Sequence, residues 1–213
     1  MNDQFQQFLL RYPQLGGCSQ SILAAEALIT EVFRHDGSFF CCGNGGSAAD
    51  CEHICGEFLK GFLLKREIPQ SDADIFDSCF GEEGNALAKK LQGGLKAVSL
   101  LSHPALNSAF ANDVDPNLNY AQQLYALGRK GDVLFAISTG GNALNVKYAL
   151  MAAQVKGLKT VLLTGNKHGI CEKYADISIC VPESETYKIQ ELHLPVYHYL
   201  CMAVEDHFFG CGK

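Results

Sequence analysis

The chain is poor in several features that would each have indicated a class of protein. It has no tryptophan, six prolines and three methionines among its 213 residues. No uninterrupted apolar run reaches the length of about 18 residues that predicts a membrane-spanning helix. The first residues, Met-Asn-Asp-Gln-Phe-Gln-Gln, lack the basic region and the apolar stretch of a secretory signal. We therefore expect a soluble cytoplasmic protein with no membrane partner.

Positive charge is also scarce. Seventeen lysines and arginines stand against 23 acidic residues, which gives a net charge of −6, and no basic run is present. A surface that follows nucleic-acid phosphates needs clustered basic residues, so no nucleic-acid partner is expected. The ten cysteines lie mostly in apolar runs, and without a secretory signal they are expected to be reduced thiols.

The length and the apolar content of 47% suit one hydrophobic core, so residues 1–213 are predicted to form a single domain. Its N-terminal segment, residues 1–36, is predicted to be helical, with helices over 2–11 and from an N-cap at Ser19 onward. The polar segment of about residues 65–94 carries several acidic residues, among them Asp72, Asp74, Asp77, Glu82 and Glu83, and only a weak helical pattern around 86–91. We interpret this segment as an insertion rather than a second domain.

Short apolar runs separated by helical stretches predict a parallel α/β sheet. The runs are residues 38–42, 96–101, 133–137, 160–163 and 176–181. The fold class expected is α/β, a three-layer α/β/α sandwich with a five-stranded parallel sheet in flavodoxin-like order. Folds of this kind bind ligands outside the carboxyl ends of the strands, where the strand order reverses.

Glycine-rich loops follow two of these runs, Gly43-Asn44-Gly45-Gly46-Ser47 and Ser138-Thr139-Gly140-Gly141-Asn142. Glycines allow backbone amides to approach an anion closely, and the helix that follows the first loop adds a favourable dipole. One such loop alone is equally consistent with a tight turn, but two at one sheet edge favour a phosphorylated ligand. Neither loop has the spacing of a dinucleotide fingerprint or of a nucleotide P-loop, which argues against nicotinamide and ATP chemistry.

Titratable side chains accompany the first loop and the last helix. His53 and Glu57 are four residues apart and share a helix face with Asp50, an arrangement that an exposed surface pair would also show. The helix predicted over 186–209 is interrupted by polar residues, among them Gln190, His193 and His198. A single histidine on an apolar helix is more often a buried, hydrogen-bonded residue than a catalyst, and that is the interpretation for His193.

Together these residues resemble the phosphoheptose isomerase branch of the sugar isomerase (SIS) family, over roughly residues 35–62 and 110–209. The matching motifs are Gly43 to Ser47 with Asp50, His53 and Glu57; Asn112-Asp113; Gly131 to Leu134 with Ile137 to Thr139; Leu163 to Gly165; and Ile189 to Glu191 with His198. The resemblance implies the SIS fold, and it implies substrate-binding roles for Asn44, Gly45, Gly46, Ser47, Asn112, Asp113, Ser138, Thr139, Gly140, Asn142 and Gln190.

The same resemblance implies isomerisation of sedoheptulose 7-phosphate in a homotetramer with sites between subunits. It assigns Glu57 as general base and His198 as general acid for proton transfer through an enediol, and zinc bound by His53, Glu57, Gln190 and His198. A carboxylate and an imidazole suit ketose–aldose conversion, which needs a base for a carbon-bound proton and an acid for the oxyanion. An amide oxygen is a weak zinc ligand, so modest affinity is expected.

Departures from the family pattern leave the substrate open. Gly140 and Ala143 stand where the family's phosphate loop has serines, and Tyr187 replaces an aspartate that contacts substrate hydroxyls. The alternatives are a non-catalytic SIS protein that binds a sugar phosphate or a protein such as a replication initiator, and an SIS regulatory or etherase module. The retained Glu57 and His198 favour the isomerase.

Overall fold

The computed structural model describes residues 3–210, and a five-stranded parallel sheet lies at its centre. The strand order is β2-β1-β3-β4-β5, and every neighbouring pair is parallel. The strands are β1 (Phe39–Cys42), β2 (Ala97–Ser99), β3 (Val133–Ile137), β4 (Lys159–Thr164) and β5 (Ile177–Cys180). This order confirms the expected fold class, and it reverses direction between β1 and β3, where the two glycine-rich loops begin.

The central strands are continuous apolar runs because helices cover both faces of the sheet. All five residues of β3 are buried, and Phe39 of β1 pairs with Val133 of β3. The carboxylate of Asp132 fixes this register at the start of the strands. It accepts the backbone N–H of Ser38 at 2.8 Å and that of Arg129 at 2.7 Å.

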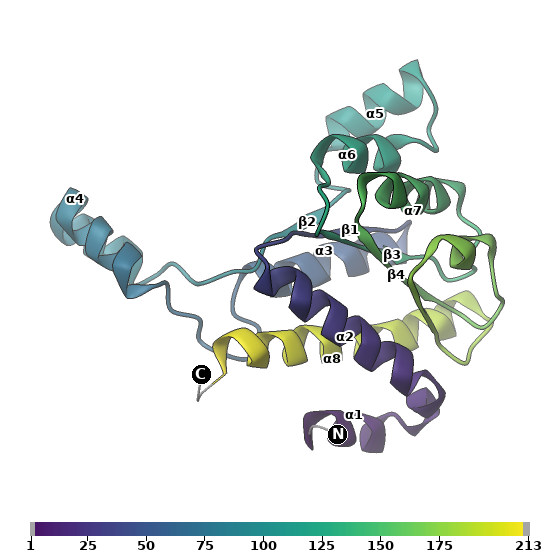
Figure 1. Ribbon diagram of the computed structural model, residues 1–213, viewed down its shortest axis with the longest axis horizontal. Coiled ribbons are helices and arrows are strands. Elements are labelled where there is room, and N and C mark those ends of the chain that lie inside the picture. Colours follow the sequence, from purple (N-terminus) through teal and green to yellow (C-terminus); the bar gives the residue numbers. More distant parts are fainter. Residues whose placement is uncertain (1–2, 211–213) are drawn as a thin grey trace.

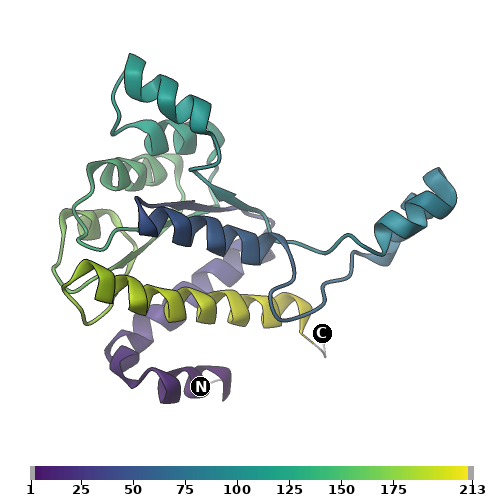
Figure 2. The same cartoon turned by 180° about the vertical axis from the view of Figure 1, so that it is seen from behind.

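Two helical layers flank the sheet (Figures 1 and 2). One layer contains α1 (Asp3–Arg11), α2 (Ser19–Arg34), α3 (Gly46–Leu59) and α8 (Thr186–Phe209). The other contains α6 (Asn119–Leu127) and α7 (Leu144–Lys156), with α5 (Pro104–Asp113) outside α6. Short 3₁₀ helices, η1 (Pro13–Cys18) and η2 (Ile170–Tyr174), complete the described elements. No helix among residues 3–210 is long and apolar enough to cross a membrane.

The helix ends follow the sequence signals in part. Helix α7 stops at Lys156 because Gly157 adopts a left-handed conformation with φ 75°, as the Lys-Gly pair predicts. Ser19 is the first residue of α2, but its predicted role as N-cap is wrong: its hydroxyl donates to the carbonyl of Gly16, outside the helix. Asn2, predicted to begin the first helix, lies outside the described residues.

Residues 65–94 form an arm that projects away from the rest of the molecule (Figures 1 and 2). Its helix α4 (Gln70–Ala88) is far longer than the weak pattern at 86–91 indicated, and it is broken at Gly81, where φ is 57°. The arm exposes Ile75, Phe80 and Leu87. No other element covers these apolar side chains, so they do not gather on one face of the helix. The one-sided periodicity from which a helix is predicted is therefore missing.

A buried ion pair anchors the root of this arm. The Nε of Arg66 donates to Glu205 of α8 at 2.8 Å, and its other nitrogens donate to the carbonyls of Phe58 and Glu57 at the end of α3. Glu205 also accepts the N–H groups of residues 62, 63 and 64. The turn after α3 is therefore tied to α8 by charge-assisted hydrogen bonds.

Candidate active site

The two glycine-rich loops lie side by side at the carboxyl ends of β1 and β3. Asn44 of the first loop and Asn145 at the start of α7 exchange two amide hydrogen bonds, of 2.9 and 2.8 Å. The hydroxyl of Tyr120 donates to the carbonyl of Gly43 at 2.6 Å. Asn145 and Tyr120 were not predicted as site residues, because nothing in their sequence context distinguishes them from ordinary helix residues.

In the first loop the glycines serve close contacts and an unusual backbone conformation. Gly45 has φ 56°, which favours glycine. A Cβ on Gly46 would lie 2.4 Å from Nε2 of Gln190, so the absence of a side chain at Gly46 lets the Gln190 amide lie against the start of α3. Ser47 is buried in the first turn of α3. The structure thus brings Gly46, Ser47 and Gln190 together beside a helix N-terminus, where an anion is favoured.

The second loop is held by its own backbone and by the neighbouring strand. Ser138 donates its N–H to Leu163 of β4, and Gly141, with φ 64°, donates to the carbonyl of Ser138. Asn142 uses both ends of its amide internally, since its nitrogen donates to the carbonyl of Gly140 and its oxygen accepts the N–H of Ile170. Its side chain therefore braces the loop, and backbone amides and hydroxyls remain the groups that face a ligand.

Helices α3 and α8 run side by side (Figure 2) and bring the predicted acid–base residues together. Nε2 of His53 lies 3.2 Å from Oε1 of Glu57, and Nζ of Lys60 lies 3.0 Å from the other carboxylate oxygen. The rings of His53 and His198 are 5.1 Å apart, nearly perpendicular. Glu57 is buried, whereas the side chain of His53 is 42% exposed, so the group opens to solvent on one side.

A chain of four polar groups passes through His53. The Tyr197 hydroxyl lies 3.1 Å from both Asp50 and Nδ1 of His53, and His53 in turn contacts Glu57. The Tyr197 hydroxyl thus links Asp50 to His53, and it holds the imidazole beside the predicted base Glu57.

His198 is neutral at physiological pH and has a free ring nitrogen. Burial lowers its pKa, and nearby His53 lowers it further, against a smaller opposing effect of Glu57. Its Nε2 is buried without a hydrogen-bond partner. A buried polar atom in that state is costly unless a ligand satisfies it, so this nitrogen is a candidate contact for substrate or metal.

Other predicted residues lie farther from this group. Gln190 contacts Gly46, which is seven residues and so about 10 Å along the helix from His53. Within residues 3–210, Asn112 and Asp113 have no hydrogen bond to either loop; they pair with each other at the exposed end of α5. His193 is completely buried, as predicted, but the expected hydrogen bond is wrong, because both ring nitrogens are buried without a partner. Burial lowers its pKa to about 4, against a smaller opposing effect of the Thr164 backbone.

The described cavities do not enclose the acid–base residues. A cavity of about 640 Å³ lies within the arm, lined by Arg66, Ile68, Asp77, Asn85 and Leu91 among others. A second, of about 400 Å³, lies between α2 and α8. The group around Glu57 is reached from solvent through the half-exposed side chain of His53.

Comparison with known proteins gives consistent matches. The SIS domain model matches residues 105–203. The phosphoheptose isomerase of Methylibium petroleiphilum is 37% identical over 195 residues, covering 90% of this chain and 84% of the relative. That of Synechocystis is 32% identical over 190 residues, covering 89% and 84%. The structure of phosphoheptose isomerase from Neisseria gonorrhoeae is 27% identical, with a TM-score of 0.73 and 95% of both chains covered.

The order of the parallel sheet, the SIS match and these relatives together identify the class of this protein: it is a sugar-phosphate isomerase. Its reaction belongs to carbohydrate metabolism. The chain belongs to the phosphoheptose isomerase family.

Proposed function

We propose that the chain interconverts sedoheptulose 7-phosphate and an aldoheptose 7-phosphate through an enediol. The observation that carries this proposal is the meeting of Glu57, His53 and His198 between α3 and α8. The first glycine-rich loop lies about 10 Å away from His53 along α3. The names of the relatives support a phosphoheptose as the sugar.

In this mechanism Glu57 removes the proton from the sugar carbon and returns it to the neighbouring carbon. Lys60 and His53 each contact one oxygen of its carboxylate, which orients the base. Neutral His198, whose Nε2 has no protein partner, contacts the substrate oxygen and exchanges a proton with it. The Tyr197 hydroxyl, which bonds Asp50 and His53, keeps the imidazole of His53 in place beside Glu57.

The loops hold the phosphate and the sugar in this proposal. Backbone amides at the start of α3 and the hydroxyls of Ser47, Ser138 and Thr139 supply the donors, with no fixed positive charge. Asn44, Gly45, Gly46, Gly140, Asn142 and Gln190 shape the loops, and Asn112 and Asp113 would contribute from another subunit.

Zinc fits this site in part. The buried, unpartnered Nε2 of His198 and the pair His53–Glu57 offer suitable donors, and Gln190 would complete the set. Lys60 already occupies one oxygen of Glu57, so a metal would compete with its ammonium group. When bound, zinc would polarise the substrate carbonyl.

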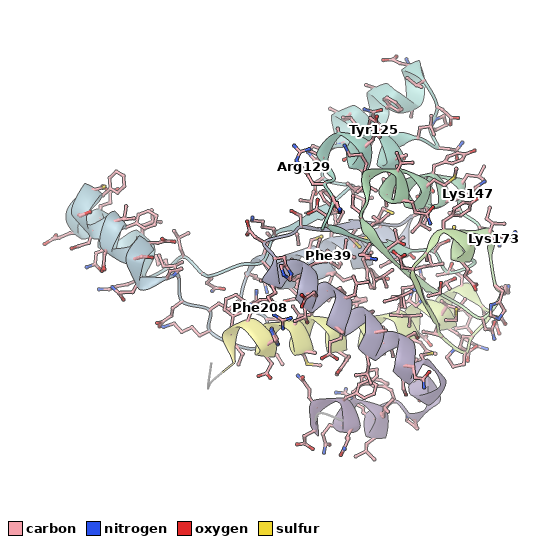
Figure 3. The ribbon with its side chains drawn as sticks, viewed as in Figure 1. Phe39, Tyr125, Arg129, Lys147, Lys173 and Phe208 are labelled. Atoms are coloured by element: carbon pink, nitrogen blue, oxygen red, sulfur yellow. The ribbon has the colours of Figure 1, made fainter. Side chains whose placement is uncertain are left out.

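We also propose a homo-oligomer, with a tetramer as the family's assembly. The arm projects without covering, exposing Ile75, Phe80 and Leu87 together with six acidic residues. Arg129, Lys147 and Lys173, which lie after α6, in α7 and in η2, provide positive charge away from the arm's helix (Figure 3). Light scattering on the parent and on a chain with Phe80→Ser and Leu87→Ser tests this; a smaller assembly for the variant supports it, and a monomeric parent contradicts it.

Purified protein incubated with sedoheptulose 7-phosphate tests the activity. The aldose should appear with the parent and with Glu52→Gln, which alters an exposed carboxylate on the same helix, but not with Glu57→Gln. Absence of aldose with the parent, with or without added zinc, would favour the non-catalytic alternative. Two features are consistent with that alternative. The side-chain amide of Asn142 is engaged in hydrogen bonds within the protein, and Gly140 and Ala143 lack the hydroxyls that the family has at these positions.

A further inference from the structure

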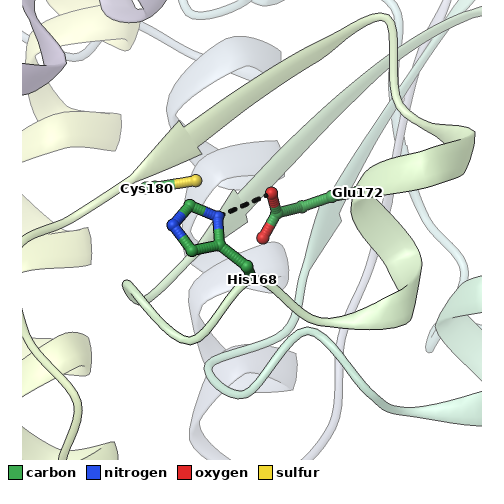
Figure 4. A group of neighbouring side chains, drawn as sticks. All are labelled: His168, Glu172 and Cys180. Carbon is green, nitrogen blue, oxygen red and sulfur yellow. Dashed lines mark hydrogen bonds and ion pairs between the residues drawn. The ribbon is translucent and has the colours of Figure 1, made fainter.

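A second group of metal-ligating side chains lies outside the acid–base site (Figure 4). His168 follows β4, Glu172 is in η2, and Cys180 ends β5. Their ligand atoms all lie within 4.8 Å of one another, and they form the one such group of three or more His, Cys, Asp or Glu among residues 3–210. None of these residues belongs to the set that the family resemblance assigns to zinc.

Two features show that the group is incomplete as it stands. Nδ1 of His168 lies 3.1 Å from Oε2 of Glu172, but Oε1 of the same carboxylate is buried with no hydrogen-bond partner. His168 holds this position with φ 50°, a conformation that is costly for a residue with a side chain. The backbone therefore sustains strain to direct an imidazole at a carboxylate whose second oxygen lacks a donor.

We propose that His168, Glu172 and Cys180 form a binding site for a zinc-class divalent transition metal. One imidazole nitrogen, one carboxylate oxygen and one sulfur are a donor set of the kind that zinc and cobalt bind tetrahedrally. Bond lengths of about 2.0–2.3 Å place tetrahedral ligand atoms about 3.4–3.6 Å apart. The separation of 3.1 Å between His168 and Glu172 is close to this value, and the Cys180 sulfur lies within 4.8 Å of both ligand atoms.

The fourth coordination position faces solvent, because the side chain of His168 is 77% exposed. Water completes the metal's coordination there, and metal reaches the site without unfolding of the chain. Burial, with a smaller effect of Glu172, raises the pKa of the Cys180 thiol to about 11. Metal binding therefore releases the thiol proton to solvent, and affinity increases with pH.

The site supports the second glycine-rich loop. Between His168 and Glu172, Ile170 donates its N–H to Asn142 and Cys171 donates to the carbonyl of Gly141. Gly169 packs so tightly against Gly141 that a Cβ on Gly169 would lie 2.3 Å from its carbonyl. A metal bridging residues 168, 172 and 180 would fix this segment, and with it the loop that we propose binds phosphate. Only this last consequence rests on the proposed function.

Cobalt titration under reducing conditions tests the site directly. Thiolate coordination gives Co²⁺ an intense near-ultraviolet charge-transfer band, and the acid–base residues include no sulfur that could produce one. We expect the band in the parent and in Glu57→Gln. It should also persist in Cys79→Ser, which removes the exposed thiol on the arm.

The band should disappear in Cys180→Ser. In His168→Ala, an exposed loop substitution that leaves the core untouched, cobalt affinity should fall by about tenfold or more. A parent without the band, or a Cys180→Ser protein that keeps it, would overturn the proposal. The band should persist in Cys18→Ser. The neighbouring Cys18 thiol donates to the backbone carbonyl of Cys180 and is not one of the three proposed ligands. None of these readouts depends on isomerase activity.

Discussion

Replacing Arg66 by methionine tests the buried ion pair beneath the acid–base site. The change removes three donated hydrogen bonds and leaves Glu205 charged at 1% side-chain exposure. Loss of one partner of a buried pair costs about 3–5 kcal/mol. For a chain of this length 1 kcal/mol corresponds to about 2–4 °C, so the unfolding temperature should fall by about 6–20 °C.

The exposed neighbouring pair supplies the control. Lys65 and Glu67 lie 2.7 Å apart with side chains 79% and 75% exposed, so Lys65→Ala should leave the melting curve almost unchanged. Replacing both Arg66 and Glu205 by apolar residues should not restore stability, because three backbone N–H groups would lose their acceptor. Thermal and urea unfolding measure both effects. An Arg66→Met protein that melts within 2 °C of the parent, about 1 kcal/mol, would refute the reasoning.

Three further predictions concern the site and its support. Because burial lowers the pKa of His193 to about 4, its neutral form contributes about 3 kcal/mol above pH 6.5 that is lost between about pH 6.5 and 4; His193→Leu should flatten the pH dependence of unfolding there, and an unchanged slope would contradict this. Asn145→Leu removes both hydrogen bonds between Asn145 and Asn44 and should raise KM several-fold more than it lowers kcat, as steady-state kinetics would show. Burial raises the pKa of Asp50 while the Tyr197 hydrogen bond opposes it, so Tyr197→Phe should raise that pKa further and move the acid limb of the pH–rate profile to higher pH; an unmoved limb would exclude Asp50 as the group that sets it.

The sheet was predictable because its strands are short, continuous apolar runs that alternate with helical stretches, a pattern typical of a buried parallel sheet. The run 133–137 is β3 without change, and the C-terminal helix has the predicted bounds of Thr186 and Phe209. The strand β2 is shorter than the run 96–101, because Leu100 and Leu101 are buried or half-buried in the turn that follows rather than in the sheet. Apolar character alone does not distinguish a strand residue from a buried turn residue.

The arm could not be predicted from periodicity. Sequence periodicity predicts a helix when its apolar residues lie on one face. Such a face forms where another element covers it. Within residues 3–210 no element packs extensively on α4, and Gly81 breaks the helix, so no continuous apolar stripe develops. Ile75 and Phe80 are exposed as a result.

Site residues were predictable only where one helix or one loop carries them. His53 and Glu57 meet because a helix brings residues four apart together. Asn145 and Asn44 are 101 positions apart and meet only through the pairing of β1 with β3. The group of His168, Glu172 and Cys180 likewise depends on the course of the segment between β4 and β5, which no spacing rule describes.

The isomerase reaction run in D₂O tests the central claim most directly. If Glu57 transfers the proton through an enediol, exchange of its carboxyl proton with solvent competes with return of that proton to the sugar, so part of the aldose formed by the parent will carry deuterium at the carbon that receives the proton. Glu57→Gln should bind the substrate but give neither aldose nor deuterium exchange. Aldose or deuterium exchange by Glu57→Gln at the parent's rate would contradict proton transfer by this carboxylate.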